Sequence, residues 1–436
     1  MRRYAEGVKP KILTTMRDYS LRQLGADTLA GITVALVALP LSIAIAIASG
    51  APPAAGLVTA VVAGFLISAL GGSRVQIGGP TGAFIVVVYG VIHDHGYHGL
   101  LLATLMAGVI LLCAGFLKAG QLIRHVPEPV IEGFTIGIAV VIAVSQLKDL
   151  AGMTGASLPA DFLPKLQGLW EMRGTVDTGS LALGIACILA IIGLRKLAPR
   201  IPWLVLVVAG ASAIAAMAVP SIETVAGRYG ALPHGLPTPE LPEISSARLV
   251  ELLPSALVIS FLAGIESLLS AMVADRMIGS AHRSNAELIA QGAANVASPL
   301  FGGLPATGAI ARTATNVNAG GRTPVAGIVH ALAILLAIVL AAPLAGALAL
   351  PALAGLLVVT AWTMSEPHRW HERLRLPRAD LALLLMTALL TVLADLTIAI
   401  CVGTMVGLAL RLSRGEVSAP RWHTPFRWGG TDRDED

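Results

Sequence analysis

Two charged residues lie deep inside apolar stretches of the sequence, and both could help to bind a charged solute. Glu266 stands in ISFLAGIESLLSAMVADRM and Arg312 in GAIARTATN. A charged side chain at membrane depth is costly and indicates a functional site. Burial disfavours the charged form of a carboxylate, so Glu266 is a candidate proton carrier, with Ser270 one turn later on the same helix face. Arg312 could balance Glu266 or attract an anion, or its side chain could instead reach the cytoplasmic surface.

Two short motifs combine Gly-Gly, Pro and Thr-Gly-Ala at the head of an apolar run too short to cross a bilayer. They are VQIGGPTGAFIVVVYG and FGGLPATGAIARTATN, and their triplets begin at Thr81 and Thr307, an offset of 226. A helix that begins inside the membrane leaves its first N–H groups unpaired and carries a partial positive charge there. Such a helix start binds anions, and a threonine can cap it or add a donor. The pair of motifs predicts an anion site between two facing helix starts.

The composition indicates a membrane protein. Of the 436 residues, 55% are hydrophobic and only 13% are charged, whereas soluble domains have about 25% charged residues. The net charge is +4, but the basic residues are spread over short loops, which argues against a nucleic-acid partner. The sequence contains no HExxH, GxSxG or P-loop pattern, and its three cysteines show no metal spacing. We therefore expect a protein without enzymatic activity, metal or cofactor.

Apolar segments recur along the chain and predict an all-α polytopic protein with fourteen membrane segments. The first half holds segments 27–49, 53–70, 80–92, 100–117, 127–147, 179–196 and 203–219. The second half holds segments 251–275, 285–298, 306–317, 323–342, 346–364, 379–393 and 396–411. The third and tenth segments, 80–92 and 306–317, are the two short half-helices.

The distribution of lysine and arginine predicts the orientation. With both termini inside, 24 of the 30 Lys and Arg residues fall in inside loops and tails, five fall outside, and Arg312 falls in the membrane. This asymmetry predicts cytoplasmic termini in the cell's inner (plasma) membrane. The predicted parts are a cytoplasmic segment 1–26, a first repeat 27–219, an extracytoplasmic loop 220–250, a second repeat 251–411 and a cytoplasmic tail 412–436.

The two halves match each other at a nearly constant offset. Because each half has seven segments, an odd number, the second copy must run inverted in the membrane. Inverted repeats with Gly/Pro-interrupted segments at corresponding positions are typical of secondary transporters, whose binding site lies at the repeat interface.

Four stretches resemble a known family. DTLAGITVALVALPLSIAIAIASGAPPAAGL, GGSRVQIGGPTGAF, VPEPVIEGFTIGIAV and FGGLPATGAIARTATNVNAGGRTPVAG resemble the SulP (sulfate permease) anion transporters, bacterial relatives of the animal anion exchangers and of prestin. The resemblance covers residues 20–412. It implies seven plus seven inverted helices, as in the uracil permease, with a core domain from the first four helices of each half, a gate domain from the last three, and a homodimer. Family members usually carry a cytoplasmic STAS domain, which this chain is expected to lack.

The resemblance also implies the residues of the site. The anion would lie between the third and tenth helices and beside the first helix, after Pro40. The matching positions are Pro80, Thr81, Gly82, Ala83, Gly308, Ala309, Ile310, Ala311, Arg312, Leu41 and Ile45. Glu266 with Ser270 matches the coupling position and resembles proton-coupled members. Leu41, where many relatives carry Gln, and the apolar Ile310 depart from the pattern, which weakens any inference of sodium coupling.

We expect a secondary active transporter of a small inorganic or organic anion of the sulfate, bicarbonate or dicarboxylate class. It would be proton-coupled, a symporter, and would work by an elevator-type shift of the core against the gate. Two alternatives remain open. A nucleobase permease of the same fold would need acidic groups in both the eighth and tenth helices, whereas the tenth has Arg312. A passive anion channel or exchanger would leave a buried Glu266 without an obvious use.

Overall fold

The computed structural model describes residues 7–16, 19–121, 127–155, 158–198, 202–219, 221–394 and 396–414. Most of the predicted cytoplasmic tail 412–436, from residue 415 onward, lies outside the described residues, as do residues 1–6 of the predicted N-terminal segment. The described chain is overwhelmingly helical, which confirms the predicted fold class.

The first half contains a continuous series of helices that match the predicted segments. They are α2 (Ile12–Thr15), α3 (Leu21–Ala48), α4 (Pro53–Leu70), η2 (Gly82–Phe84), α5 (Ile85–Phe116), η3 (Ala119–Gln121), α6 (Glu128–Ser145), α7 (Leu147–Leu150), α8 (Phe162–Glu171), η5 (Met172–Thr175), α9 (Thr178–Leu197) and α10 (Trp203–Ala218). The third and fourth predicted segments are joined in α5, but Gly96 breaks the helix there with φ 72°. Glycine adopts this left-handed conformation without steric cost.

The second half repeats this order. Its helices are α11 (Val225–Tyr229), α12 (Ser246–Ile278), α13 (Ser284–Leu300), α14 (Ile310–Asn318), α15 (Pro324–Gly346), α16 (Leu350–Met364), η6 (Pro367–Arg369), α17 (Trp370–Arg373), α18 (Arg378–Leu393) and α19 (Leu396–Ser413). Every predicted segment of this half contains a helix, although segment 306–317 becomes helical only at Ile310. The helix α12 begins five residues earlier than predicted, within the expected loop 220–250, where Ser245 caps it by accepting a hydrogen bond from the Arg248 N–H.

Seven helices in the described ranges are long and apolar enough to cross a membrane by length and composition. They are α3, α4, η2 with α5, α6 with α7, α9, α12 and α15. Several other helices are shorter. Among them is α14, the short tenth segment, which has nine residues and at about 1.5 Å per residue is too short to span a bilayer alone.

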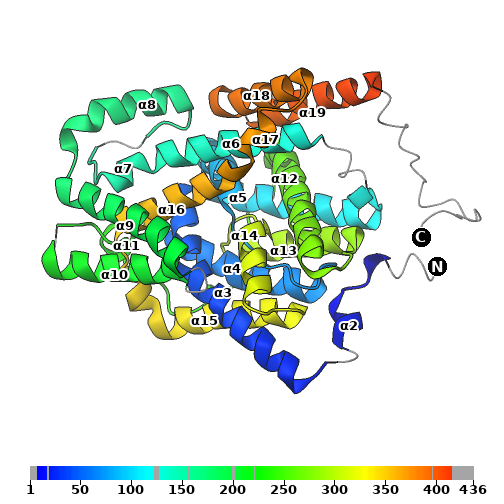
Figure 1. Cartoon of the computed structure of the whole chain (residues 1–436), viewed down its shortest axis with the longest axis horizontal. Helices are drawn as coiled ribbons and strands as arrows, with labels where there is room; N and C mark the ends of the chain where they lie inside the picture. The colour runs from blue at the N-terminus through cyan, green and yellow to red at the C-terminus, as the bar shows by residue number, and fades with distance from the viewer. Residues whose placement is uncertain are drawn as a thin grey trace, which may run out of the picture.

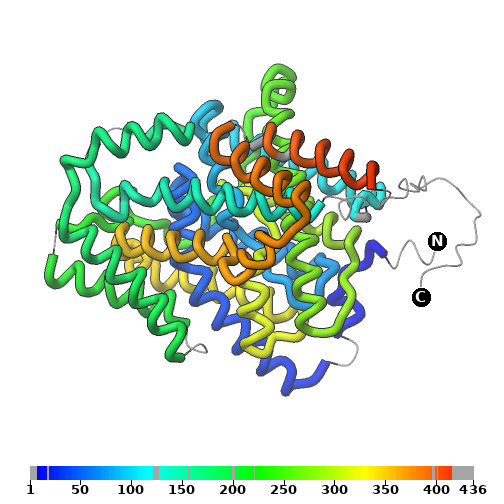
Figure 2. Tube along the Cα trace, turned by 45° about the horizontal axis from the view of Figure 1, so that its top comes forward, coloured from blue at the N-terminus to red at the C-terminus, as the bar shows by residue number. Residues whose placement is uncertain are grey.

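The helices pack in two groups, which we call the core group and the gate group. The core group is α3, α4, α5, α12, α13, α14 and α15, and the gate group is α6, α9, α10, α16, α18 and α19. Figure 1 shows the gate group along the left and top of the molecule and most of the core group in its centre and lower right. In Figure 2 the helices α18 and α19 lie beside α6, although they are far apart in the sequence.

Two carboxylates at corresponding positions of the repeats join the halves. Asp27 in α3 accepts hydrogen bonds from the Arg322 N–H (2.8 Å) and the Thr323 N–H (3.3 Å) at the start of α15. Glu251 in α12 lies 2.8 Å from His95, just before the kink at Gly96 in α5. Each half thus contacts the beginning of the fourth membrane segment of the other half, as an inverted repeat requires.

One feature was not predicted from the sequence: a small β-sheet at the centre of the core group. The strands β1 (Gly78–Gly79) and β2 (Thr307–Gly308) pair antiparallel, with Gly78 opposite Gly308 and Gly79 opposite Thr307. The Ala309 N–H extends the ladder by donating to the Ile77 carbonyl (2.8 Å). Backbone groups ahead of the two short helices therefore satisfy each other, which non-helical backbone at membrane depth requires.

Candidate functional site

The heads of the two short helices are extended, and the helices begin later than predicted. The predicted segment 80–92 becomes helical only at η2 and α5, and 306–317 only at α14. Thr81 and Ala309 occupy the positions before the helical turns, and neither side chain caps a backbone N–H. Of the two roles expected for the threonines, capping the helix or adding a hydroxyl donor, neither threonine caps its helix. Both hydroxyls instead donate to α12.

The helix α12 receives one hydrogen bond from each motif. The Thr81 hydroxyl donates to Glu266 Oε2 (3.0 Å), and the Thr307 hydroxyl donates to the Ala263 carbonyl (3.0 Å). Ala263 and Glu266 are three residues apart and therefore lie on one face of α12. This face brings the candidate proton carrier to the head of the third membrane segment.

Glu266 is half-buried, whereas Thr81 is buried. Among the described residues no ion pair joins Glu266 to a cation, so Arg312 does not balance its charge in this conformation. A membrane carboxylate without a cation partner is stable in the neutral form or beside water.

Arg312 is buried, with 2% of its surface exposed. Its Nη2 donates to Ser42 Oγ of α3 (3.1 Å), and its Nη1 lies against Gly79 of β1, where a Cβ would overlap it. The atoms Nε and Nη1 have no hydrogen-bond partner within the described part of the chain. The side chain therefore does not extend to the cytoplasmic surface. It lies next to the paired strands, where Nε and Nη1 are available to donate hydrogen bonds.

Ser270 contacts the tenth segment rather than Glu266. The Ser270 hydroxyl lies 3.4 Å from Thr313 Oγ1 in α14. Thr313 Oγ1 also accepts a hydrogen bond from the Ile77 N–H (3.1 Å). Asn316, one turn beyond Thr313 in α14, donates to the Val75 carbonyl (2.8 Å). Polar side chains of α14 thus hold the segment that leads into β1.

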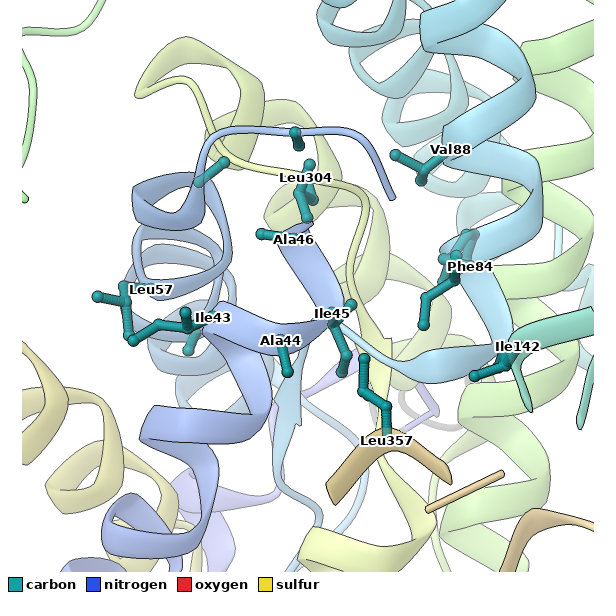
Figure 3. Packing of buried hydrophobic residues seen from close by; sticks show 14 of the residues in the cluster. Ile43, Ala44, Ile45, Ala46, Leu57, Phe84, Val88, Ile142, Leu304 and Leu357 are labelled. Carbon is teal, nitrogen blue, oxygen red and sulfur yellow. The ribbon is translucent and has the colours of Figure 1, made fainter. Parts of the chain in front are cut away.

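The first membrane segment passes beside these strands. Pro40 lies inside α3 and cannot donate a backbone hydrogen bond to the preceding turn. Leu41 is half-buried, and Ile45 is almost fully buried. Figure 3 shows Ile45 and Phe84 of the core group near Leu357 of α16 and Ile142 of α6. The predicted site residues of α3 therefore lie where the core group meets the gate group.

The remaining candidates surround the same point. Pro80, Gly82, Gly308 and Ala309 are buried, Ala83 is half-buried, and Ile310 and Ala311 are exposed. A Cβ at Gly82 would lie 3.1 Å from Met364 Sδ at the end of α16. The structure thus gathers the predicted residues at the junction of β1, β2, the two short helices and α3, on the side that faces the gate group.

Four residues near the site were missed from the sequence: Ser42, Gln76, Thr313 and His330. Ser42 comes directly after Pro40-Leu41, where a hydroxyl is also expected to satisfy backbone groups that the proline leaves unpaired, so the sequence did not distinguish it. His330 of α15 is fully buried, lies near Gly64 of α4, and has no partner for either ring nitrogen in the described ranges. No local pattern distinguishes it from an ordinary helix residue.

Comparisons with known proteins identify relatives of the whole chain. A family model described as "Sulfate permease family" matches residues 24–387. The chain is 42% identical over 399 residues to "Putative sulfate transporter YvdB" of Bacillus subtilis, covering 91% of this chain and 75% of that protein. It is 33% identical over 411 residues to "Bicarbonate transporter BicA" of Picosynechococcus sp., covering 90% of this chain and 71% of that protein.

Solved structures have the same fold. The transmembrane domain of a cyanobacterium bicarbonate transporter BicA aligns with a TM-score of 0.78 at 30% identity, covering 89% of this chain and 98% of that one. Murine Solute Carrier 26 family member A9 aligns with a TM-score of 0.85 at 19% identity, covering 95% of this chain and 72% of that one. The second likeness concerns the fold alone.

Proposed function

This chain belongs to the sulfate permease family of anion transporters, and from that premise we propose that it is a proton-coupled secondary active transporter of a small anion. The anion would lie beside the paired strands β1 and β2, at the starts of the third and tenth membrane segments. Proton symport and an elevator-type mechanism are parts of this proposal.

The observation that carries the proposal is the buried guanidinium of Arg312. It lies against β1, donates one hydrogen bond to Ser42, and keeps Nε and Nη1 unbonded within the described residues. Buried donors are normally satisfied, and a guanidinium recognises carboxylate and sulfate-like oxygens through its planar set of N–H groups. The start of α14 adds a partial positive charge of the same sign. A small oxyanion supplies the acceptors that this site lacks.

Glu266 is the proposed proton carrier. It lies in the same site as Arg312, it accepts a hydrogen bond from Thr81 at the head of the third segment, and no cation pairs with it in the described part of the chain. A charged Glu266 would repel an anion bound nearby, whereas a protonated one would not. Binding of the proton and of the anion would therefore favour each other, which is the thermodynamic requirement for symport.

The named relatives supply the substrate classes. One is called a putative sulfate transporter and another a bicarbonate transporter. Both anions are small, and both present several oxygens to N–H donors. We therefore place sulfate, bicarbonate and small dicarboxylates first among the substrates to test.

The proposal extends to the whole protein. The core group would carry the anion across the membrane by moving against the gate group, with both termini on the cytoplasmic side of the inner membrane. The positive-inside distribution of lysine and arginine supports this orientation. The protein would act as a homodimer whose gate groups stay fixed in the membrane.

Uptake into proteoliposomes tests the proton coupling. An inward proton gradient should drive uptake of the labelled anion above the internal concentration in the wild type. Glu266→Gln keeps the shape of the side chain and removes its titration, so it should abolish gradient-driven uptake while anion exchange between loaded vesicles continues. Proton-driven uptake by Glu266→Gln at the wild-type level would exclude Glu266 as the carrier. An anion current that needs no gradient of protons would favour a channel instead.

A further inference from the structure

Glu287 of α13 is a fully buried carboxylate close to the proposed anion site, and it takes no part in the function proposed above. We propose that Glu287 is a positioning residue that fixes β1 and Gln76 beneath β2 and so sets the affinity for the anion. This inference rests on the proposed anion site.

The carboxylate of Glu287 is completely buried and is held by four donors. Its Oε2 accepts the backbone N–H groups of Gly72 (2.9 Å) and Ser73 (3.2 Å), which connect α4 to β1. Its Oε1 accepts the hydroxyl of Ser267 in α12 (3.0 Å) and Nε2 of Gln291 (2.9 Å). One carboxylate thus joins three elements of the core group.

The connection from α4 to β1 is fixed from both sides. The Arg283 N–H, at the start of α13, donates to the Gly72 carbonyl (3.0 Å). A Cβ at Gly72 would overlap the Arg283 carbonyl, so the two backbones approach more closely than any other residue would allow. Glu287 therefore binds a segment, the connection from α4 to β1, that also packs closely against the start of α13, the helix that carries Glu287.

Gln76 links this network to the anion site. Its Nε2 donates to Ser267 Oγ (2.8 Å), so Ser267 connects the Glu287 carboxylate to Gln76. The same amide lies against Gly308 of β2, in the space that a Cβ there would occupy. Gln76 is only 4% exposed and comes two residues before β1. The network therefore contacts the segment before β1 and, through Gln76, the strand β2.

Ser267 also directly follows Glu266 in α12. Its hydroxyl is bound by Gln76, by Gln291 (2.7 Å) and by Glu287, so the rotation of α12 at this turn is fixed. A binding site holds its ligand well only when its donors are kept within about 0.5 Å of the productive geometry by such supporting bonds. Loss of an acceptor oxygen of Glu287 would loosen β1 and the neighbouring turn of α12 together.

Glu287 does not contact the anion itself. Its oxygens are satisfied from within the core group, and Gln76 and Ser267 separate it from Gly308 and Glu266. A change at Glu287 should therefore alter the Michaelis constant through geometry, with the chemistry of the site left intact.

The test compares anion uptake by Glu287→Gln and wild-type protein in proteoliposomes. Glutamine replaces one of the two acceptor oxygens with an NH2 group, which is a donor. Either the N–H groups of Gly72 and Ser73 or the donors of Ser267 and Gln291 then lose their acceptor. We expect KM for the anion to rise at least about tenfold and Vmax to stay within about threefold of the wild type. A residue that supports only stability would lower Vmax and the melting temperature and leave KM unchanged.

Glu132→Gln is the matched control. Glu132 is also a buried carboxylate, but it lies in the gate group, where it accepts from Arg373 Nε (3.2 Å). Its substitution should leave KM at the wild-type value. Gln76→Ala removes the contact with Gly308 and leaves the Glu287 carboxylate unchanged. It should therefore raise KM, and it provides the test if the Glu287→Gln protein does not fold and insert into the membrane.

The outcomes separate this inference from the proposed site. If Gly308→Ala raises KM but both Glu287→Gln and Gln76→Ala leave it unchanged, Glu287 does not position the site. The proposal that the anion binds at β2 is then still supported. If Gly308→Ala also leaves KM unchanged, the anion does not bind at β2. If Glu132→Gln raises KM as much as Glu287→Gln, the effect is general and the positioning role is again wrong.

Discussion

Among single residues, Arg312 and Glu266 matter most for the proposed function, and no ion pair joins them in the described residues. Each is an ionisable group to which the surrounding apolar helices offer no opposite charge. Arg312 lacks acceptors and Glu266 lacks a cation in the described ranges. A bound anion would supply acceptors to Arg312, and a bound proton would neutralise Glu266.

Arg312→Ala should weaken the binding of the transported anion to the purified protein. A hydrogen bond to a charged group contributes about 1.5–3 kcal/mol, which corresponds to a loss of about tenfold to a hundredfold in affinity. Arg312→Lys keeps the charge but not the planar set of donors, so its affinity should be intermediate. Isothermal titration at low and high salt measures both effects. Wild-type affinity in Arg312→Ala would show that the guanidinium does not contact the anion.

At the scale of elements, the paired strands β1 and β2 decide where the two short helices meet. Gly308 packs on Gln76, and Gly79 packs on Arg312 with φ 151°, a conformation that L-residues avoid. The Gly-Gly and Thr-Gly pairs are therefore required by close approach of side chains from other elements, in addition to the helix starts that follow them.

Gly308→Ala should raise KM for the anion by about tenfold or more, because the added methyl overlaps the Gln76 amide and displaces β2. Gly90→Ala, in α5, is the matched control: no atom lies within 4 Å of its Cβ position. It should leave KM unchanged and slightly stabilise the helix. Combining Gly308→Ala with Gln76→Ala should not worsen KM beyond the Gln76→Ala value, since the overlapping group is then absent. A normal KM in Gly308→Ala would contradict the placement of the site.

Asp27 provides a test of how the halves are held together. Asp27→Ala leaves the N–H groups at the start of α15 without their acceptor and should lower stability by about 2 kcal/mol. The melting temperature in detergent measures this loss, with Glu251→Ala as the control. Glu251, at the corresponding position of the other half, has a more exposed side chain and should show a smaller change. Equal shifts for the two variants would contradict the structural role of Asp27.

The sequence predicted most of the helices but not the paired strands or the contacts between elements. Apolar segments located the helices to within several residues, and the repeat offset identified Thr81 and Thr307 as equivalent. It could not show that Gly79 and Thr307 pair directly, because pairing depends on how the two halves meet in space. The same limit explains why the sequence left open whether Thr81 caps a helix or donates elsewhere, and why Ser42 and Gln76 were missed.

At the scale of the whole molecule, the site lies at the junction of the two helix groups. Gly82 of the core group lies close to Met364 and Ile142 of the gate group, and the core group holds both Arg312 and Glu266. A shift of the core group against the gate group would carry the complete site, including the network around Glu287, without breaking it.

A cross-link between the groups tests this motion. In a background with Cys113, Cys187 and Cys401 replaced, Gly82→Cys combined with Met364→Cys places two thiols close enough for a mercuric ion to bridge. Bridging should stop uptake, and dithiothreitol should restore it, because transport by an elevator requires the groups to slide. Each single variant should be insensitive to the ion. Continued transport by the bridged protein would contradict relative motion of the two groups.

Thermal stabilisation of the purified protein by sulfate, bicarbonate, oxalate, fumarate, succinate and uracil, measured at two pH values, tests whether an anion binds beside β1 and β2. We expect at least one anion, and not uracil, to raise the melting temperature of the wild type. The same anion should have little effect on Arg312→Ala or Gly308→Ala and its full effect on Gly90→Ala. Stabilisation by uracil alone, or equal stabilisation of all four proteins by the anion, would contradict an anion site beside β1 and β2.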